Sequence, residues 1–87
     1  MNLSIELTAY PLDDEYLPVV EKYIKHLRSY KNIKIEVFPT CSVIFGKHDD
    51  VIDVLSSSIK WSVKQKNKVV FLSKFLPNYE AIKRKLI

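Results

Sequence analysis

Hydrophobic and polar positions alternate over residues 3–10, where every second side chain is apolar: Leu3, Ile5, Leu7 and Ala9. A period of two with β-compatible residues predicts a strand with one buried face, and Pro11 ends it. The acidic run 13–15 then supplies an N-cap and negative charge for the first turn of a helix. The next apolar positions recur every three or four residues, which predicts an amphipathic helix. Its stripe consists of Leu17, Val20, Ile24, Leu27 and Tyr30.

Two short strands are predicted next, because residues 33–38 alternate and residues 41–45 form an apolar run bounded by Pro39 and Gly46. The link between them is too short for a parallel crossover, so the pair is expected to be antiparallel.

A second helix is predicted to begin at Asp49 and Asp50, which we interpret as N-cap residues. Its stripe is expected to consist of Ile52, Leu55, Ile59 and Val63. Residues 68–75 read as a fourth strand, and residues 78–87 as a short, basic C-terminal helix.

This order of elements predicts one α+β domain over residues 1–87 with a ferredoxin-like βαββαβ plait. The right-handed crossovers of its two split units give a four-stranded antiparallel sheet with both main helices on one face. The last helix, residues 78–87, lies outside that plait.

The face of the sheet opposite the helices is expected to carry a large apolar patch. Residues 68–75 are apolar on both sides of the predicted strand, and residues 43–45 are as well. The same face would carry Glu6, Thr8, Tyr10 and Phe38 from the first two strands. A contiguous patch of this kind suits packing against a second copy, or a pocket for a flat, partly cationic molecule. The sequence leaves both interpretations open.

Charge and cysteine content indicate the environment in which the protein is expected to work. The net charge of +4 comes from basic residues dispersed along the chain, which is more typical of a solvated surface than of a nucleic-acid interface. The single Cys41 cannot form an internal disulfide, no signal peptide is recognisable, and no apolar run is long enough to cross a membrane. We therefore expect a cytoplasmic protein.

Catalytic and cofactor chemistry is not indicated. His26 and His48 read as surface histidines, Cys41 as a structural thiol, and the acidic pairs as helix caps rather than metal ligands. With one glycine, Gly46, the chain has no glycine-rich phosphate loop. We expect a protein that is not an enzyme and that needs no cofactor or metal. RNA binding is disfavoured, because acids on the open face would repel phosphate.

Three blocks resemble the YkoF-like proteins, which bind thiamin or its hydroxymethylpyrimidine moiety. Residues 8–15, which read Thr-Ala-Tyr-Pro-Leu followed by three acidic residues, are similar to that family's Tyr-Pro-Met and acidic-pair segment. Residues 41–46 resemble its Ser-Thr-Val-Leu-x-Gly strand, and residues 50–54 resemble the helix opening after it. The resemblance spans about residues 3–75.

The resemblance implies a small-molecule-binding protein that forms a homodimer or tetramer through its sheet and serves thiamin salvage, transport or sensing. The family's Ser-Thr pair supplies hydroxyls near the pyrimidine, and Cys41 and Ser42 occupy the matching positions. Tyr10 matches the family's tyrosine. The candidate ligand-binding residues are Glu6, Thr8, Tyr10, Phe38, Cys41 and Ser42. The alternatives are an assembly or regulatory module without a ligand and, less favoured, an RNA-binding domain.

Overall fold

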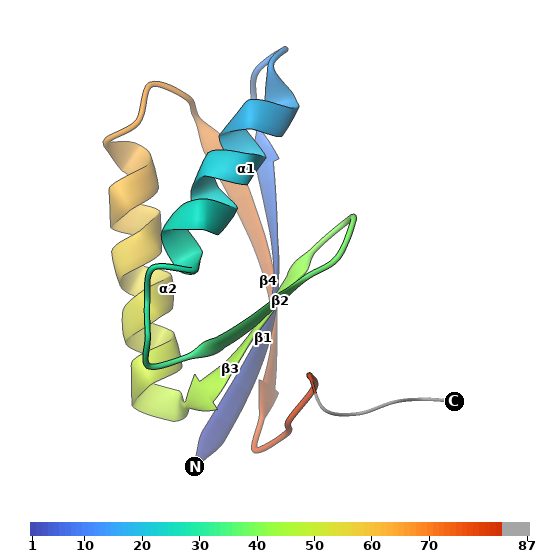
Figure 1. Ribbon diagram of the computed structural model, residues 1–87, viewed down its shortest axis with the longest axis vertical. Helices are drawn as coiled ribbons and strands as arrows, with labels where there is room; N and C mark the ends of the chain where they lie inside the picture. Colours follow the sequence, from blue (N-terminus) through green and yellow to red (C-terminus); the bar gives the residue numbers. More distant parts are fainter. Residues whose placement is uncertain (83–87) are drawn as a thin grey trace.

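The computed structural model describes residues 1–82, which form four strands and two helices in the order β1–α1–β2–β3–α2–β4 (Figure 1). Local sequence explains most of the boundaries, because prolines and polar turns separate the periodic segments. The elements are β1 (Asn2–Pro11), α1 (Tyr16–Leu27), β2 (Lys34–Val37), β3 (Ser42–Lys47), α2 (His48–Val63) and β4 (Val69–Pro77).

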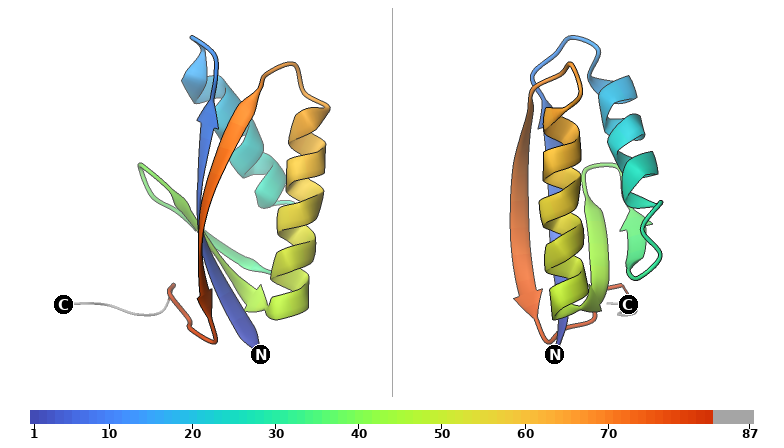
Figure 2. Two further views of the ribbon diagram at one scale, coloured as in Figure 1. Left: turned by 180° about the vertical axis from the view of Figure 1, so that it is seen from behind. Right: turned by 90° about the vertical axis from the view of Figure 1, so that its left-hand side faces the viewer.

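The four strands form one antiparallel sheet in the order β2-β3-β1-β4. Both helices pack on the same face of that sheet, which leaves the opposite face without a helix (Figures 1 and 2). We call this opposite side the open face. Strand order and layers together confirm the predicted ferredoxin-like plait. Within residues 1–82, neither helix has the length and apolar character needed to span a bilayer.

The core lies between the helices and the inward face of the sheet. The alternation along β1 is confirmed, because its odd-numbered apolar side chains all point toward the helices. Burial of these side chains supplies the main driving force for folding, at about 25 cal/mol per Å² of apolar surface. The buried cluster consists of Leu3, Ile5, Leu7, Tyr23, Leu27, Ile44, Val51 and Val54.

The predicted helix stripes were partly wrong. Leu17 is 58% exposed and Val63 is 76% exposed, although both were expected in the core. α1 buries Tyr23 instead, and α2 turns two serines inward, Ser58 and Ser62. The Tyr23 and Ser58 hydroxyls are joined by a hydrogen bond of 2.9 Å where the two helices meet. A small polar residue is therefore buried because a neighbouring helix supplies its partner.

The predicted starts of the helices also need correction. α2 begins at His48 with Lys47 as its N-cap, so Asp49 and Asp50 lie in the first turn and do not cap it. α1 has Glu15 at its N-cap without a side-chain cap, and Asp13 Oδ1 instead accepts the Glu15 N–H at 2.9 Å. The acids of α2 thus act through the helix dipole, and Asp13 acts through a local turn.

Neutralising Asp50 is expected to destabilise the protein mildly, because its charge lies in the first turn of α2 beside the positive end of the helix dipole. We expect Asp50→Asn to lower the free energy of unfolding by about 0.3–1 kcal/mol at low salt. The loss should shrink in high salt, which screens exposed charges. Asp53→Asn, one turn further along α2, is the matched control in denaturant titrations. Equal losses for both variants, or a loss that ignores salt, would contradict the dipole account.

Residues 78–82 contain turns and no helix, so the described part of the predicted helix 78–87 is not helical, and residues 83–87 lie outside the described residues. The turn begins at Asn78, whose φ of 55° is a conformation that asparagine tolerates well. Ser4 on the open face fixes it, because its hydroxyl bonds the Tyr79 carbonyl at 2.5 Å and accepts the Ala81 N–H at 3.0 Å. We call residues 78–82 the strap (Figure 2).

The strap divides the open face into two halves. Ser4 is completely buried and Phe45 nearly so, although neither side chain faces the helices. The other half, formed by the end of β1 and the start of β4, remains exposed.

Candidate functional site

The exposed half of the open face carries three of the candidate residues. Glu6, Thr8 and Tyr10 alternate along β1, and the register places Thr8 opposite Leu72 and Tyr10 opposite Val70. These neighbours from β4 are themselves half exposed, so polar and apolar side chains share one surface. We call Tyr10, Val70 and Leu72 the apolar patch.

Glu6 already has a cationic neighbour on this face. Its Oε1 lies 3.9 Å from the Lys74 ammonium of β4, and both side chains are well exposed to solvent. An exposed pair of this kind contributes little energy, so another cation can replace Lys74 at small cost.

A small cleft lies on the helix side of the sheet, between α1 and the loop that joins β2 to β3. Its accessible volume is about 40 Å³, which is close to the space that one water molecule occupies. We call it the loop cleft. Its lining residues are Leu7, Thr8, Ala9, Tyr16, Val20, Tyr23, Ile24, Phe38, Pro39, Thr40, Cys41 and Ser42.

The loop cleft brings together four of the six candidate residues, Thr8, Phe38, Cys41 and Ser42. The sequence did not predict this grouping, because Thr8 and Phe38 were expected on the open face together with Glu6 and Tyr10. Ser42 is buried opposite Leu7 and therefore faces the helices, whereas Glu6 and Tyr10 lie on the other side of the sheet. The structure thus separates the Ser42 hydroxyl from the Glu6 carboxylate and places each on its own surface.

Two hydrogen bonds hold the loop beside the cleft. The Phe38 N–H donates to the Cys41 carbonyl at 2.8 Å, which closes a tight turn around Pro39. The Thr8 hydroxyl donates to the Thr40 carbonyl at 3.2 Å and ties that turn to β1. Both bonds are peripheral, and Phe38 is half exposed, so the loop can move at modest cost.

The chemical state of Cys41 depends on its surroundings. Burial raises the pKa of the thiol, and the nearby Glu6 carboxylate raises it further, against a smaller opposing effect of Lys74. The thiol is therefore protonated at neutral pH, and a protonated thiol is a poor nucleophile and a weak hydrogen-bond donor. Among residues 1–82, no group of three or more His, Cys, Asp and Glu is placed to hold a metal ion.

Sequence reasoning missed the contribution of α1 to this cleft. Tyr16 and Tyr23 line it with aromatic surface, and Val20 and Ile24 complete the same side. Their spacing of three to four residues marks one helix face, which was the available signal. Val20 and Ile24 were assigned to the core alone and Tyr16 and Tyr23 were not singled out, because nothing in the sequence indicates that a loop lies over the first turns of α1.

Comparisons with known proteins agree with the fold. No family model matches the sequence, and no curated protein matches it. Among solved structures, protein SP2199 from Streptococcus pneumoniae is similar over 95% of this chain and 92% of its own, with 21% identity and a TM-score of 0.80.

Two other solved structures share the plait. A Thermotoga maritima protein, provisionally named a thiamine biosynthesis/salvage protein, is similar over 99% of this chain and 91% of its own, with 16% identity and a TM-score of 0.76. A domain of unknown function, DUF77, from Bacillus cereus is similar over 87% of this chain and 75% of its own, with 18% identity and a TM-score of 0.70. At these identities the likeness establishes the fold alone.

Proposed function

We propose that this protein binds thiamin or its hydroxymethylpyrimidine moiety in the loop cleft, without catalysing a reaction. The observation that carries the proposal is the convergence of Thr8, Phe38, Cys41 and Ser42 on one cleft. The provisional name of the Thermotoga maritima neighbour supports the same ligand class. In this proposal the protein acts in thiamin salvage, transport or sensing in the cytoplasm.

The lining of the cleft suits a flat pyrimidine. Tyr16, Tyr23 and Phe38 offer aromatic surface, on which a heteroaromatic ring can stack. The Ser42 hydroxyl and the Thr40 carbonyl provide a donor and an acceptor for ring nitrogens and an amino group. The raised pKa of Cys41 keeps a neutral thiol at the rim, which avoids a charge beside the ring.

Ligand entry requires the cleft to widen. Its volume of about 40 Å³ is far below the roughly 300–1,000 Å³ typical of small-molecule sites. Displacing the β2–β3 loop breaks the bond from Thr8 to Thr40 and moves Phe38 outward. The bound pyrimidine then lies between α1 and the loop. A thiazolium attached to it extends around the loop toward Glu6, whose carboxylate is partly exposed on the open face.

Isothermal calorimetry with thiamin and with hydroxymethylpyrimidine tests this proposal. Ser42→Ala should weaken both ligands by about 0.5–1.5 kcal/mol, the usual loss for one neutral hydrogen bond. Glu6→Gln should weaken thiamin by up to about 1 kcal/mol, because the carboxylate is exposed, and leave hydroxymethylpyrimidine unchanged.

Asp53→Asn removes one negative charge from the exposed side of α2 and is the control for net charge. It should leave both affinities unchanged. If neither compound binds to well-folded protein, or if Ser42→Ala and the unmodified protein bind equally well, the proposed ligand site is wrong.

The second candidate function is assembly through the open face, and the apolar patch favours it. Tyr10, Val70 and Leu72 are each about half exposed and adjoin one another across β1 and β4. A second copy that packs its own patch there would bury this surface, as sheets do when they pack face to face. We propose a homodimer or tetramer formed in this way. The loop cleft lies on the helix side, so assembly through the apolar patch leaves the pyrimidine part of the proposed site accessible.

A further inference from the structure

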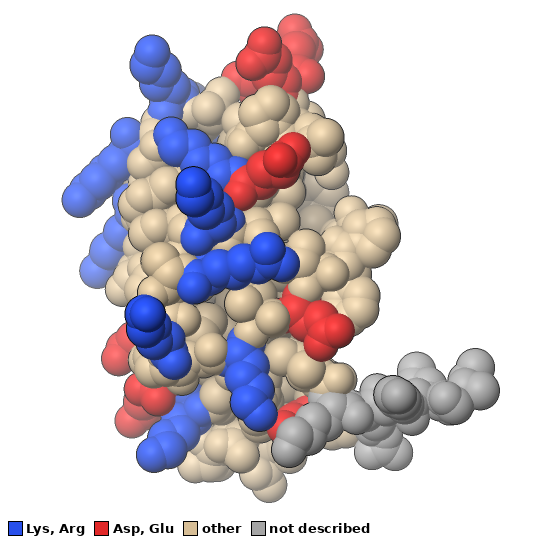
Figure 3. All heavy atoms as spheres, in the orientation of Figure 1, with Lys and Arg blue, Asp and Glu red and all other residues tan. Residues whose placement is uncertain are grey.

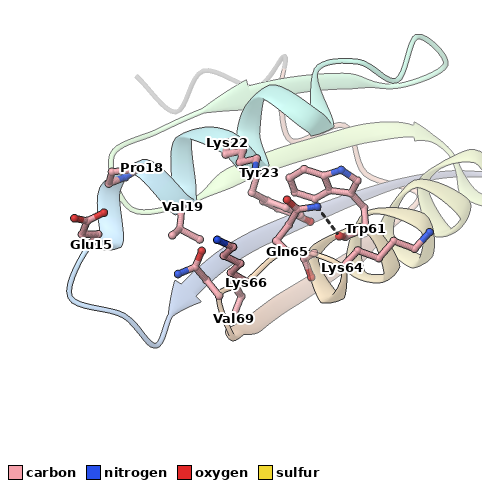
Figure 4. A pocket seen from close by; sticks show the side chains of 12 residues that line it. Glu15, Pro18, Val19, Lys22, Tyr23, Trp61, Lys64, Gln65, Lys66 and Val69 are labelled. Atoms are coloured by element: carbon pink, nitrogen blue, oxygen red, sulfur yellow. Dashed lines mark hydrogen bonds between the residues drawn. The ribbon is translucent and has the colours of Figure 1, made fainter.

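A second and larger cavity lies between the C-terminal end of α2 and the N-terminal half of α1 (Figure 4). Its accessible volume is about 420 Å³, which falls within the range of sites for small organic ligands. We call it the helix cleft. Its lining residues are Glu15, Pro18, Val19, Lys22, Tyr23, Trp61, Ser62, Lys64, Gln65, Lys66, Asn67 and Val69.

The aromatic wall of the helix cleft is held in place by contacts outside it. The Trp61 indole stacks on His26 with ring centroids 4.1 Å apart and planes 8° apart, so one face of the indole is covered. The Tyr23 ring lies 6.3 Å from it at a tilt of 39°, and the Tyr23 hydroxyl is bonded to Ser58. Rings fixed in this way lose little conformational entropy when a flat ligand packs against them.

Cations also line the cavity. Lys22 comes from α1 and Lys66 from the α2–β4 loop, and neither forms an ion pair with any residue in the range 1–82. Figure 4 shows Lys66 reaching toward α1, whereas Lys64 extends away from the cavity along α2. Glu15 is the single acid in the lining. Two unpaired ammonium groups beside one cavity attract an anion.

The C-terminal end of α2 does little to oppose an anion, because its last carbonyl groups have donors. The Trp61 carbonyl accepts the Lys64 N–H at 3.1 Å and the Gln65 side-chain amide at 3.2 Å. The Ser62 carbonyl accepts the Gln65 N–H at 3.1 Å. On a larger scale, Lys and Arg side chains gather on the side of the molecule that α1 and α2 form (Figure 3). The excess of basic side chains on this side favours a negatively charged ligand.

We propose that the helix cleft binds a small molecule that joins a flat aromatic ring to a phosphate group. The ring packs against Trp61 and Tyr23, and the apolar side chains of Val19 and Val69 enclose it. The phosphate pairs with Lys22 and Lys66, whose ammonium groups suit a phosphate as point charges. This site is separate from the loop cleft and does not depend on it, although Tyr23 contributes to both.

The single tryptophan makes the test direct, because Trp61 is the only source of indole fluorescence in the chain. Adenosine 5′-monophosphate serves as the probe, with adenosine and inorganic phosphate as separate arms. We expect the nucleotide to change the fluorescence saturably, and adenosine to bind at least about tenfold more weakly because it lacks the charged contacts. Inorganic phosphate alone should leave the indole emission unchanged.

Lysine variants test which side chains contact the phosphate group. Lys22→Gln and Lys66→Gln should each weaken the nucleotide about threefold to fivefold, as expected for a partly exposed ion pair. Lys60→Gln removes the same charge from α2, outside the cavity, and should change the affinity less than about twofold. Ser42→Ala should leave nucleotide binding intact, which separates this site from the loop cleft. Melting curves by circular dichroism verify that each variant is folded.

Three outcomes would overturn the proposal. The first is the absence of any saturable change in fluorescence at millimolar nucleotide. The second is equal binding of adenosine and its monophosphate, which would remove the role of the lysines. The third is an equal loss for Lys60→Gln and the two cavity variants, which would mean non-specific attraction to a basic surface.

Discussion

Replacing Leu72 by Lys is expected to convert a self-associated protein into a monomer. Leu72 is 57% exposed in the single chain, and it lies on the open face opposite Thr8, next to Val70 at 49% and Tyr10 at 48%. In the proposed sheet-to-sheet contact this side chain is buried. A lysine there would place an unpaired charge in an apolar interface, which costs several kcal/mol and is enough to dissociate a small dimer.

Light scattering at micromolar concentration measures the effect. The unmodified protein should have at least twice the chain mass of 10.2 kDa, and Leu72→Lys should have the chain mass itself. Val63→Lys is the matched control, because it also replaces an apolar side chain by lysine. Val63 is 76% exposed and lies on α2, away from the sheet. A monomer for the unmodified protein, or dissociation by Val63→Lys as well, would contradict assembly through the apolar patch.

Replacing Ser58 by Leu is expected to cause a large loss of stability. Ser58 is completely buried between α1 and α2, and its hydroxyl bonds Tyr23 at 2.9 Å and the Leu55 carbonyl at 3.1 Å. A leucine overpacks this contact, which costs about 1–3 kcal/mol. It also leaves the buried Tyr23 hydroxyl without this partner, which costs about 1–3 kcal/mol more. Together these losses take a substantial part of the roughly 5–15 kcal/mol typical of a small domain.

Denaturant titration compares this variant with Val63→Ala, which removes apolar atoms from the position that helix periodicity assigned to the core. Val63 is exposed, so its change should stay within about 0.5 kcal/mol. Because association adds to apparent stability, both variants should be measured in the Leu72→Lys background, where the protein is expected to be a monomer. A larger loss for Val63→Ala than for Ser58→Leu would mean that α2 packs against the sheet through a different face.

The chemistry of Tyr23 agrees with this view of the helix contact. Burial raises the pKa of its hydroxyl to about 12, partly offset by the hydrogen bond with Ser58. The hydroxyl is therefore neutral at every physiological pH, and its role is structural, because its hydrogen bond joins α1 to α2. Because the folded-state pKa is above the ordinary value of 10.0, deprotonation in the unfolded chain would lower stability as pH rises above about 10.

Strand structure was the part of the fold that the sequence predicted well. In β1, apolar and polar side chains alternate, and this alternation alone is enough to assign each side chain to one face of the sheet. Pro11 closes β1 and Pro39 lies in the turn after β2, since proline limits both helix continuation and strand pairing. The order of strands and helices then left the plait as the natural topology.

Helix orientation was predicted less well, for a physical reason. A helix presents side chains at every angle around its axis, so several adjacent stripes can look apolar. In α2, the choice between Val63 and Ser58 depended on how closely α1 approaches and on the hydroxyl of Tyr23. A hydrophobic pattern does not identify a serine as a core residue. A serine can nevertheless be buried in the core when a partner forms a hydrogen bond with its hydroxyl.

Local sequence was sufficient to specify the plait, the inward face of β1 and the apolar character of β4, because these depend on periodicity and turn chemistry. Tertiary packing was needed to establish which candidate residues meet. Ser42 and Glu6 lie on opposite faces of the sheet, and the loop cleft collects Thr8, Phe38, Cys41 and Ser42. Such convergence depends on the path of a loop across α1, and it is set by contacts between segments that are distant in the sequence.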